Sequence, residues 1–254
     1  MFKALRIAVL LLILVTVSLS TWLTQARSTD WNNSLWAKVY PINADGSAAT
    51  QRYIDSLELG DFASIETFIA REAQKFGHGL EQPLRMELGP QIAAQPPALP
   101  ASPGILQVMG WSLGMRWWAA SVTDDRIAPD VRIFVRYHQP RDGLRLEDSV
   151  GMQKGMVGVV NAWAGRRHAP VNDVIIAHEL LHTLGATDKY DPATGLPSFP
   201  DGYAEPERSP LYPQRYAEIM GGRIPVSESE AMIPQALRYA VIGPATAREI
   251  RLLE

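Results

Sequence analysis

The spacing of apolar residues predicts four strands in the first two thirds of the chain. Apolar and polar residues alternate in 34–42 and in 130–138, the pattern of a strand with two unlike faces. In the second stretch one side carries Val131, Ile133 and Val135 and the other Arg132 and Arg136, so we expect one face to meet water. Shorter apolar stretches at 84–89 and 155–163 predict two more strands, the latter with glycines that allow close backbone approach.

Helical spacing predicts helices on both sides of these strands. Residues 60–77 carry apolar side chains at helical intervals, with Asp61 as the expected N-cap and Gly77 as the expected stop. Residues 105–122 are rich in Trp and Met, and we expect a helix packed on the sheet rather than an exposed apolar patch. Residues 243–253 predict a closing helix. The uncharged stretch 90–104, with five prolines, predicts a loop.

The N-terminus predicts export. Lys3 and Arg6 precede an apolar run of 17 residues from Ile7 to Leu23, at the lower limit for a membrane-spanning helix. Because the positive charges come first, the rest of the chain should cross the membrane. Residues 1–27 are therefore interpreted as a signal anchor, with a cleaved signal peptide as the alternative, and residues 28–254 lie outside the cytoplasm in both cases.

Composition narrows the chemistry. The chain has 254 residues and a net charge of −3, and its basic residues form no stripe, so nothing favours a nucleic-acid partner. It contains no cysteine, so a metal site must use His, Asp or Glu.

Such a site is predicted in the sequence HELLHTLGATDKYD, which runs from His178 to Asp191. Residues 172–185 predict a helix capped by Asn172 or Asp173. On that helix His178 and His182 stand one turn apart on one side, about 6 Å along the axis, so both imidazoles can reach one ion. Glu179, one residue round, can face the open side of the ion and act as a general base.

The third ligand follows from the glycine. Gly185 ends the helix and permits a positive φ, so the chain can double back and bring Asp188 to the ion. The alternatives are Asp191 and a glutamate further along the chain, as in gluzincins. Those glutamates are Glu205, Glu207, Glu218, Glu228 and Glu230.

From Gly155 to the C-terminus the chain resembles the metzincin metalloproteases, whose signature is HExxHxxGxxH. It matches at His178, Glu179, His182 and Gly185 and has Asp188 at the last position, as some short members of that clan do. Metzincins also place a methionine in a tight turn beneath the metal, and here Met220 stands before two glycines, 32 residues after Asp188.

The resemblance implies an α+β fold of the zincin type. It has a small mixed twisted sheet, an active-site helix, a Met-turn and a C-terminal helix, here preceded by an N-terminal apolar helix. We expect one metalloprotease-like domain over 28–254, with 28–154 as its N-terminal part and 155–254 as the part that carries the zinc motif.

The expected activity is that of a zinc-dependent endopeptidase, anchored in the cell membrane with its catalytic domain on the extracytoplasmic side. Zn²⁺ is held by His178, His182 and Asp188, and the substrate is a peptide or protein. Tyr190 or Tyr216 can stabilise the oxyanion.

The alternative function is a membrane-anchored binding module whose metal is structural. It requires a fourth protein ligand, and the candidates for it are His138 and His168. Calcium could bind the acids of the segment after the motif, although a solvated acidic loop is the preferred interpretation. These acids are Asp191, Asp201, Glu205 and Glu207.

Overall fold

The structure is a computed structural model that describes residues 31–98, 104–141, 143 and 145–253, together with the single positions 6, 7, 11 and 15. The predicted N-terminal anchor thus falls almost entirely outside the described residues. Among the residues that are described, no helix combines the length and the hydropathy needed to cross a membrane.

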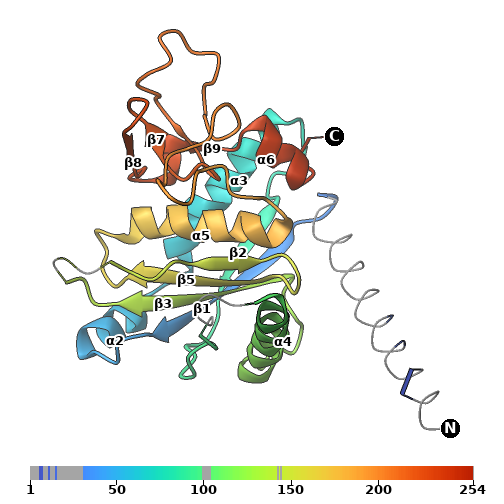
Figure 1. The fold of residues 1–254 in the computed structure, drawn as a ribbon. Helices are drawn as coiled ribbons and strands as arrows, with labels where there is room; N and C mark the ends of the chain where they lie inside the picture. The colour runs from blue at the N-terminus through green and yellow to red at the C-terminus, as the bar shows by residue number, and fades with distance from the viewer. Residues whose placement is uncertain are drawn as a thin grey trace.

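The strands of the main sheet and the helices that pack on it are interspersed along the first three quarters of the chain (Figure 1). The strands of the main sheet are β1 (Leu35–Asn43), β2 (Leu84–Leu88), β3 (Val131–His138), β4 (Val150–Met152) and β5 (Val157–Trp163). The helices are α2 (Ala48–Asp55), α3 (Ala63–Lys75), preceded by a 3₁₀ turn at Leu59–Phe62, α4 (Ile105–Val122) and α5 (Ala169–Leu184).

These strands form one mixed sheet in the order β2-β1-β3-β5-β4. Neighbours among β2, β1, β3 and β5 run parallel, and only β4, at the edge, pairs antiparallel with β5. Parallel pairing requires crossover connections, and helices provide most of them. The predicted α+β class with a small mixed sheet is therefore present.

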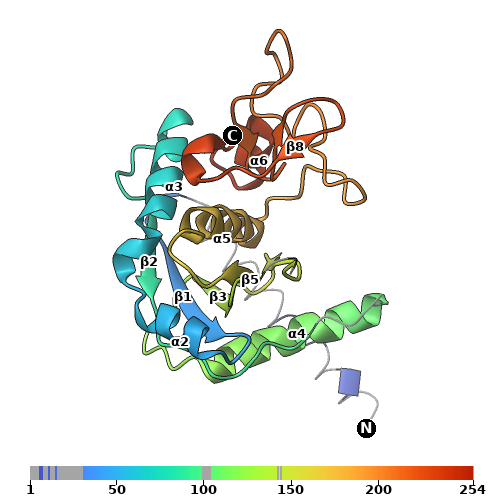
Figure 2. The same cartoon turned by 90° about the vertical axis from the view of Figure 1, so that its left-hand side faces the viewer.

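Helices cover both faces of the sheet. One core lies under α3 and α5 and includes Ile133 and Val135 of β3, and a second lies under α4 and includes Phe134. The views in Figures 1 and 2 show α4 and α5 on opposite sides of the strands. The prediction that one face of β3 meets water was wrong, because α4 covers Phe134 and leaves the Arg132 and Arg136 side chains only about one fifth exposed.

Helix α4 lies where the sequence predicts it, but only part of its surface is buried. Met115, Trp118 and Ala119 pack on the sheet, whereas large apolar side chains on the opposite face are exposed. Figure 2 shows one end of the helix extending past the sheet. The expectation of a helix buried in the core, rather than an exposed apolar patch, was therefore wrong for this outer face.

Several boundaries also differ from the predictions. Helix α5 begins at Ala169 with Pro170 in its first turn, so Asn172 and Asp173 lie inside it and do not cap it. The side-chain amide of Asn172 instead accepts from the backbone amide of Trp163 and donates to its carbonyl. Asp61 accepts from the Glu58 amide in the 3₁₀ turn rather than capping α3.

The chain after α5, residues 186–253, consists of turns and short elements and is called the C-terminal segment. Its elements are β6 (Ala217–Glu218), β7 (Ile224–Pro225), β8 (Ala231–Met232), a 3₁₀ turn (Leu237–Tyr239), β9 (Ala240–Val241) and α6 (Pro244–Glu249). The closing helix is thus shorter than predicted. The apolar residues of this segment join the core that contains α5, so α5 lies between the sheet and the C-terminal segment (Figure 1).

Candidate metal centre

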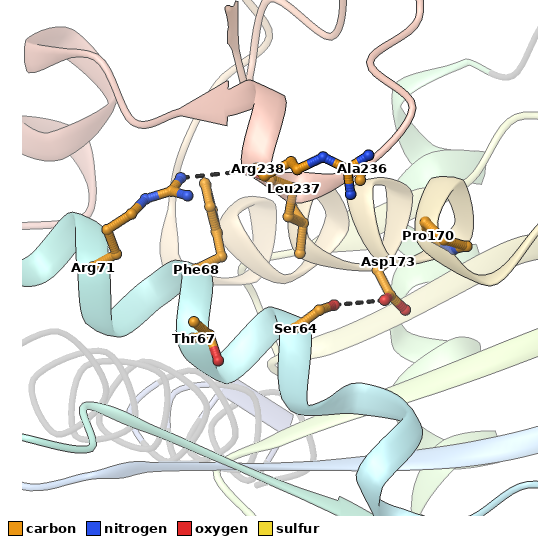
Figure 3. Close-up of a pocket in the computed structure, with 9 residues that line it drawn as sticks. All are labelled: Ser64, Thr67, Phe68, Arg71, Pro170, Asp173, Ala236, Leu237 and Arg238. Atoms are coloured by element: carbon orange, nitrogen blue, oxygen red, sulfur yellow. Dashed lines mark hydrogen bonds between the residues drawn. The ribbon is translucent and has the colours of Figure 1, made fainter.

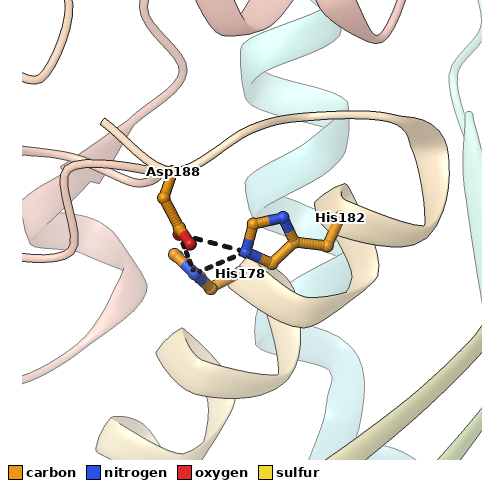
Figure 4. Close-up of side chains that lie close together, drawn as sticks. All are labelled: His178, His182 and Asp188. Atoms are coloured by element: carbon orange, nitrogen blue, oxygen red, sulfur yellow. Dashed lines mark hydrogen bonds and ion pairs between the residues drawn. The ribbon is translucent and has the colours of Figure 1, made fainter. Parts of the chain in front are cut away.

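The last two turns of α5 and the bend after them bring three ligand atoms together (Figure 4). The Nε2 atoms of His178 and His182 are 3.1 Å apart. Gly185 ends the helix with φ 109°, and the chain doubles back as predicted, so that Asp188 Oδ1 lies 3.2 Å from His178 Nε2 and 3.1 Å from His182 Nε2. These are the only residues in the described part of the chain that form a group of three or more possible metal ligands.

Backbone carbonyls fix which nitrogen of each ring is free. His178 Nδ1 lies 2.9 Å from the carbonyl of Ile219, and His182 Nδ1 lies 2.8 Å from that of Ala186. A carbonyl only accepts, so each Nδ1 carries a proton, and a ring in its neutral form turns an unprotonated Nε2 toward Asp188. When both rings are neutral, three acceptors face one another, and a cation between them would remove their mutual repulsion. Tetrahedral bonds of 2.0–2.1 Å would separate such atoms by about 3.3 Å, close to the observed spacings.

Glu179 lies beside this group and is buried. Its Oε2 has no hydrogen-bond partner in the structure, which is rare for a buried carboxylate oxygen. Burial raises the pKa of Glu179, an effect partly offset by His178 and His182 and by the amide of Gly151 on strand β4. A Cβ on Gly151 would lie 2.5 Å from both the Glu179 carbonyl and His182 Cβ, so only glycine lets the sheet edge approach the helix this closely.

The pKa values of His178 and Asp188 shift in opposite directions. Burial disfavours the charged form of His178, but hydrogen bonding to Asp188 and the charge of Glu179 outweigh it and raise its pKa. For Asp188 burial is likewise outweighed, here by hydrogen bonds from the two histidines, and its pKa falls far below the usual range. Asp188 therefore stays ionised and available as a ligand at any moderate pH.

The turn around Met220 is present and reaches one of the histidines. Met220 is fully buried, and the amides of Gly221 and Gly222 close the turn onto the Glu218 carbonyl. The carbonyl of Ile219 in this turn is the group that orients His178. The Met220 carbonyl accepts from the Lys189 amide at 2.9 Å, so the same turn also holds the segment that carries Asp188.

Glu218 is not a fourth ligand, because its carboxylate is committed to the turn. The residue is fully buried, with Oε2 accepting from the amides of Met220 and Gly221 and Oε1 accepting from the Gly243 amide and the Thr246 hydroxyl. These bonds tie the turn that orients His178 to the first residues of α6.

Glu249, at the end of α6, holds the Asp188 segment from both sides. It accepts from the amide and hydroxyl of Thr187 at 2.9 and 2.6 Å and from Lys189 Nζ at 2.7 Å. Sequence reasoning did not identify Glu249, and no local pattern could have done so, because its role depends on α6 packing beside a bend 60 residues earlier.

The two candidate tyrosines differ. Tyr190 is half-buried, and its pKa is raised to about 12 by burial, by the charge of Asp188 and by a hydrogen bond to that carboxylate. It therefore lies at the group as a protonated donor. Tyr216 instead packs against Arg215, whose guanidinium carbon is 5.9 Å from the ring centroid.

The alternative ligands have other partners or lie outside the group. Asp191 accepts from the Ala193 amide, and Glu205 pairs with Arg215. His138 lies 3.2 Å from Asn161 Oδ1, and His168 lies 3.2 Å from Arg167 Nε. None of the acids considered for calcium belongs to a group of possible ligands within the described residues, and neither do Glu228 and Glu230.

A cavity of about 330 Å³ lies on another side of α5, between α3 and residues 236–238 (Figure 3). Its polar lining includes Asp173, which accepts from the Ser64 hydroxyl at 2.5 Å, and Arg71, which donates to the Ala240 carbonyl. The cavity contains none of the three possible metal ligands and belongs to the packing of α5 under the C-terminal segment.

Comparison with known proteins assigns no family. No family model matches the chain, and no curated protein sequence is significantly similar to it. Among solved structures, one titled as a chaperone–substrate complex is similar over 86% of this chain and 34% of its own, at 15% identity and a TM-score of 0.42. OgpA from Akkermansia muciniphila is similar over 84% of this chain and 58% of its own, at 13% identity and a TM-score of 0.38. The chain thus spans one third to somewhat over half the length of these proteins, with similarity too low to carry a functional conclusion.

Proposed function

We propose that this protein is a zinc-dependent endopeptidase of the metzincin type. The observation that carries the proposal is the convergence of His178, His182 and Asp188 beside a buried carboxylate oxygen of Glu179 that lacks a partner. Two imidazoles and a carboxylate form a common ligand set of hydrolytic zinc sites. The turn at Met220 and the glycine-terminated helix agree with the metzincin signature.

In this proposal Nε2 of each histidine and Oδ1 of Asp188 would hold the ion. Bound zinc would lower the pKa of a water molecule and polarise the scissile carbonyl. Glu179 would accept a proton at its unpartnered Oε2 from the attacking water, whose oxygen would bond to the carbonyl carbon, and would deliver that proton to the leaving amine as the peptide C–N bond breaks. Its raised pKa suits a carboxylate that must hold a proton between these steps. Tyr190, protonated at neutral pH, can donate to the oxygen that gains negative charge.

The exposure of the group favours catalysis over a structural role. A structural zinc site is normally closed by a fourth protein ligand. The group has three members among the described residues, and the Asp188 side chain is 42% exposed. The open side is therefore available to water and substrate. The apolar run near the N-terminus separately supports an exported, membrane-anchored form of this enzyme.

The test compares the wild-type protein with Glu179→Gln. Zinc content is measured by mass spectrometry, and cleavage is followed with fluorescently labelled casein. We expect both proteins to bind zinc equally and the variant to lose about 10² to 10⁴-fold in kcat/KM, the usual contribution of a general base. A second variant, Asp188→Ala, should lose zinc as well as activity.

Glu205→Gln serves as the control, because it removes a carboxylate that pairs with Arg215 away from the group and should change neither quantity. Normal cleavage by Glu179→Gln, or a wild-type protein that binds no zinc after reconstitution, would contradict the proposal.

A further inference from the structure

The outer face of α4 is apolar and exposed along its whole length. Leu106, Met109, Leu113 and Trp117 are 82%, 57%, 53% and 74% exposed, respectively. Their spacing of three and four residues places them in one stripe on the helix surface. Gly110 and Ala120 continue the stripe without adding a charge.

The stripe is a second apolar face, distinct from the one that packs on the sheet. Met115, Trp118 and Ala119 lie on the opposite side of the helix and are buried against Phe134. A surface helix of a soluble domain normally carries polar residues where it faces solvent. A helix that is apolar on both sides requires a second apolar neighbour, and within the described residues this outer face has none.

The charge pattern indicates the chemistry of that neighbour. Between Glu87 and Asp124 the sequence contains one charged residue, Arg116, and no acid. Protein partners usually meet a surface with a charged and polar rim. A long helix without acids, rich in tryptophan and bearing one cation, is suited instead to the interface of an anionic lipid bilayer.

The sequence also places a bilayer within reach. The apolar run from Ile7 to Leu23 ends eight residues before Trp31, a connection of at most about 29 Å when extended. The loop after α4 meets the start of β1, since Asp130 accepts from the Trp36 amide and Asp125 from Lys38 Nζ. The C-terminal end of α4 therefore lies near the start of β1, which follows the N-terminal apolar run in the sequence.

We propose that the outer face of α4 rests on the lipid bilayer as a second membrane contact. A single apolar segment tethers a domain without orienting it, whereas two contacts fix its orientation and strengthen binding. The end of α4 that extends beyond the sheet would then lie in the headgroup region, and α5, which carries His178 and His182, would lie on the far side of the sheet (Figure 2). This inference concerns a surface and does not depend on the proposed peptidase activity.

The absence of cysteine allows a direct test. In the full-length chain, Leu106→Cys is labelled with an environment-sensitive fluorophore and reconstituted into vesicles of phosphatidylcholine and phosphatidylglycerol. The matched control is Ser229→Cys, an exposed position beside β8 on the far side of α5 (Figure 1). Vesicles with and without headgroup-labelled nitroxide lipid report whether each label touches the bilayer.

We expect a blue-shifted emission and several-fold stronger nitroxide quenching at position 106 than at position 229. Adding Leu113→Glu to the Leu106→Cys protein should reduce that quenching, because it places a negative charge in the stripe. Equal quenching at the two positions would overturn the proposal. So would a label at 106 that is shielded from water but not quenched by lipid, since this would identify a protein partner or a second copy of the chain.

Discussion

Helices α4 and α5 lie on opposite faces of one sheet, and both are apolar nearly all round. Every large apolar side chain of α5 is buried or half-buried, because the sheet lies on one side and the C-terminal segment on the other. Helix α4 has the sheet alone, and its outer stripe is exposed. The apolar composition of a helix thus predicts that both of its sides need an apolar neighbour, but it does not identify that neighbour. Protein covers both sides of α5, and we propose that lipid covers the outer face of α4.

The largest expected effect compares the same substitution on the two helices. Leu180→Ala removes a fully buried side chain of α5 and should lower the free energy of unfolding by about 2–5 kcal/mol. Leu113→Ala on the outer face of α4 should change it by less than about 0.5 kcal/mol. Denaturation by urea, followed by tryptophan fluorescence, measures both. Similar losses would show that the outer face of α4 is packed against protein.

A smaller effect on the free energy of unfolding should come from the buried carboxyl group of Asp173, near the start of α5. Burial raises the pKa of Asp173 to about 6, with the Ser64 hydrogen bond opposing and the charge of Asp61 adding to the shift. The folded chain therefore holds the proton more tightly than the unfolded chain, and stability falls as the pH rises from about 4 through 6.

Asp173→Asn should remove this loss. Its advantage over wild type in unfolding free energy should be near zero at about pH 4 and about 1–3 kcal/mol at about pH 8. Urea denaturation at the two pH values measures the difference. A difference in unfolding free energy that does not change with pH would show that the Asp173 carboxyl group is solvated. The C-terminal segment would then not fully cover the start of α5.

An effect of about the same size tests whether the C-terminal segment also holds Asp188 in place. Glu249→Gln weakens the contacts that hold Thr187 and Lys189 on either side of Asp188, and should weaken zinc binding about 10- to 100-fold. Competition with a chromogenic chelator measures the dissociation constant. Glu205→Gln is the matched control, and equal effects of the two variants would show that Glu249 only supports the fold.

Local patterns predicted the parts of the molecule that local geometry determines. The spacing of His178, His182 and Gly185 sufficed to predict the convergence with Asp188, because a helix and one left-handed residue define that path. Strand β4 was not predicted, since three residues containing a glycine give no periodicity. Its position beside Glu179 follows from tertiary packing alone.

The error at α4 has the same physical origin. An apolar periodicity reports that a face avoids water, and it does not distinguish protein from other apolar surroundings. The face of β3 with Arg132 was misinterpreted for the converse reason. Arginine can lie under a helix when an acid such as Asp125 pairs with it, so a basic residue does not guarantee a solvent-exposed face.

The bonds from Glu218 and Glu249 have a consequence for biosynthesis. All three possible ligands precede residue 189, yet the groups that orient His178 and hold the Asp188 segment come from the turn at Ile219 and from α6, near the end of the chain. A nascent polypeptide would therefore expose the histidines long before they are held in place. Under the proposed function, hydrolytic activity would arise only after translation of the final helix.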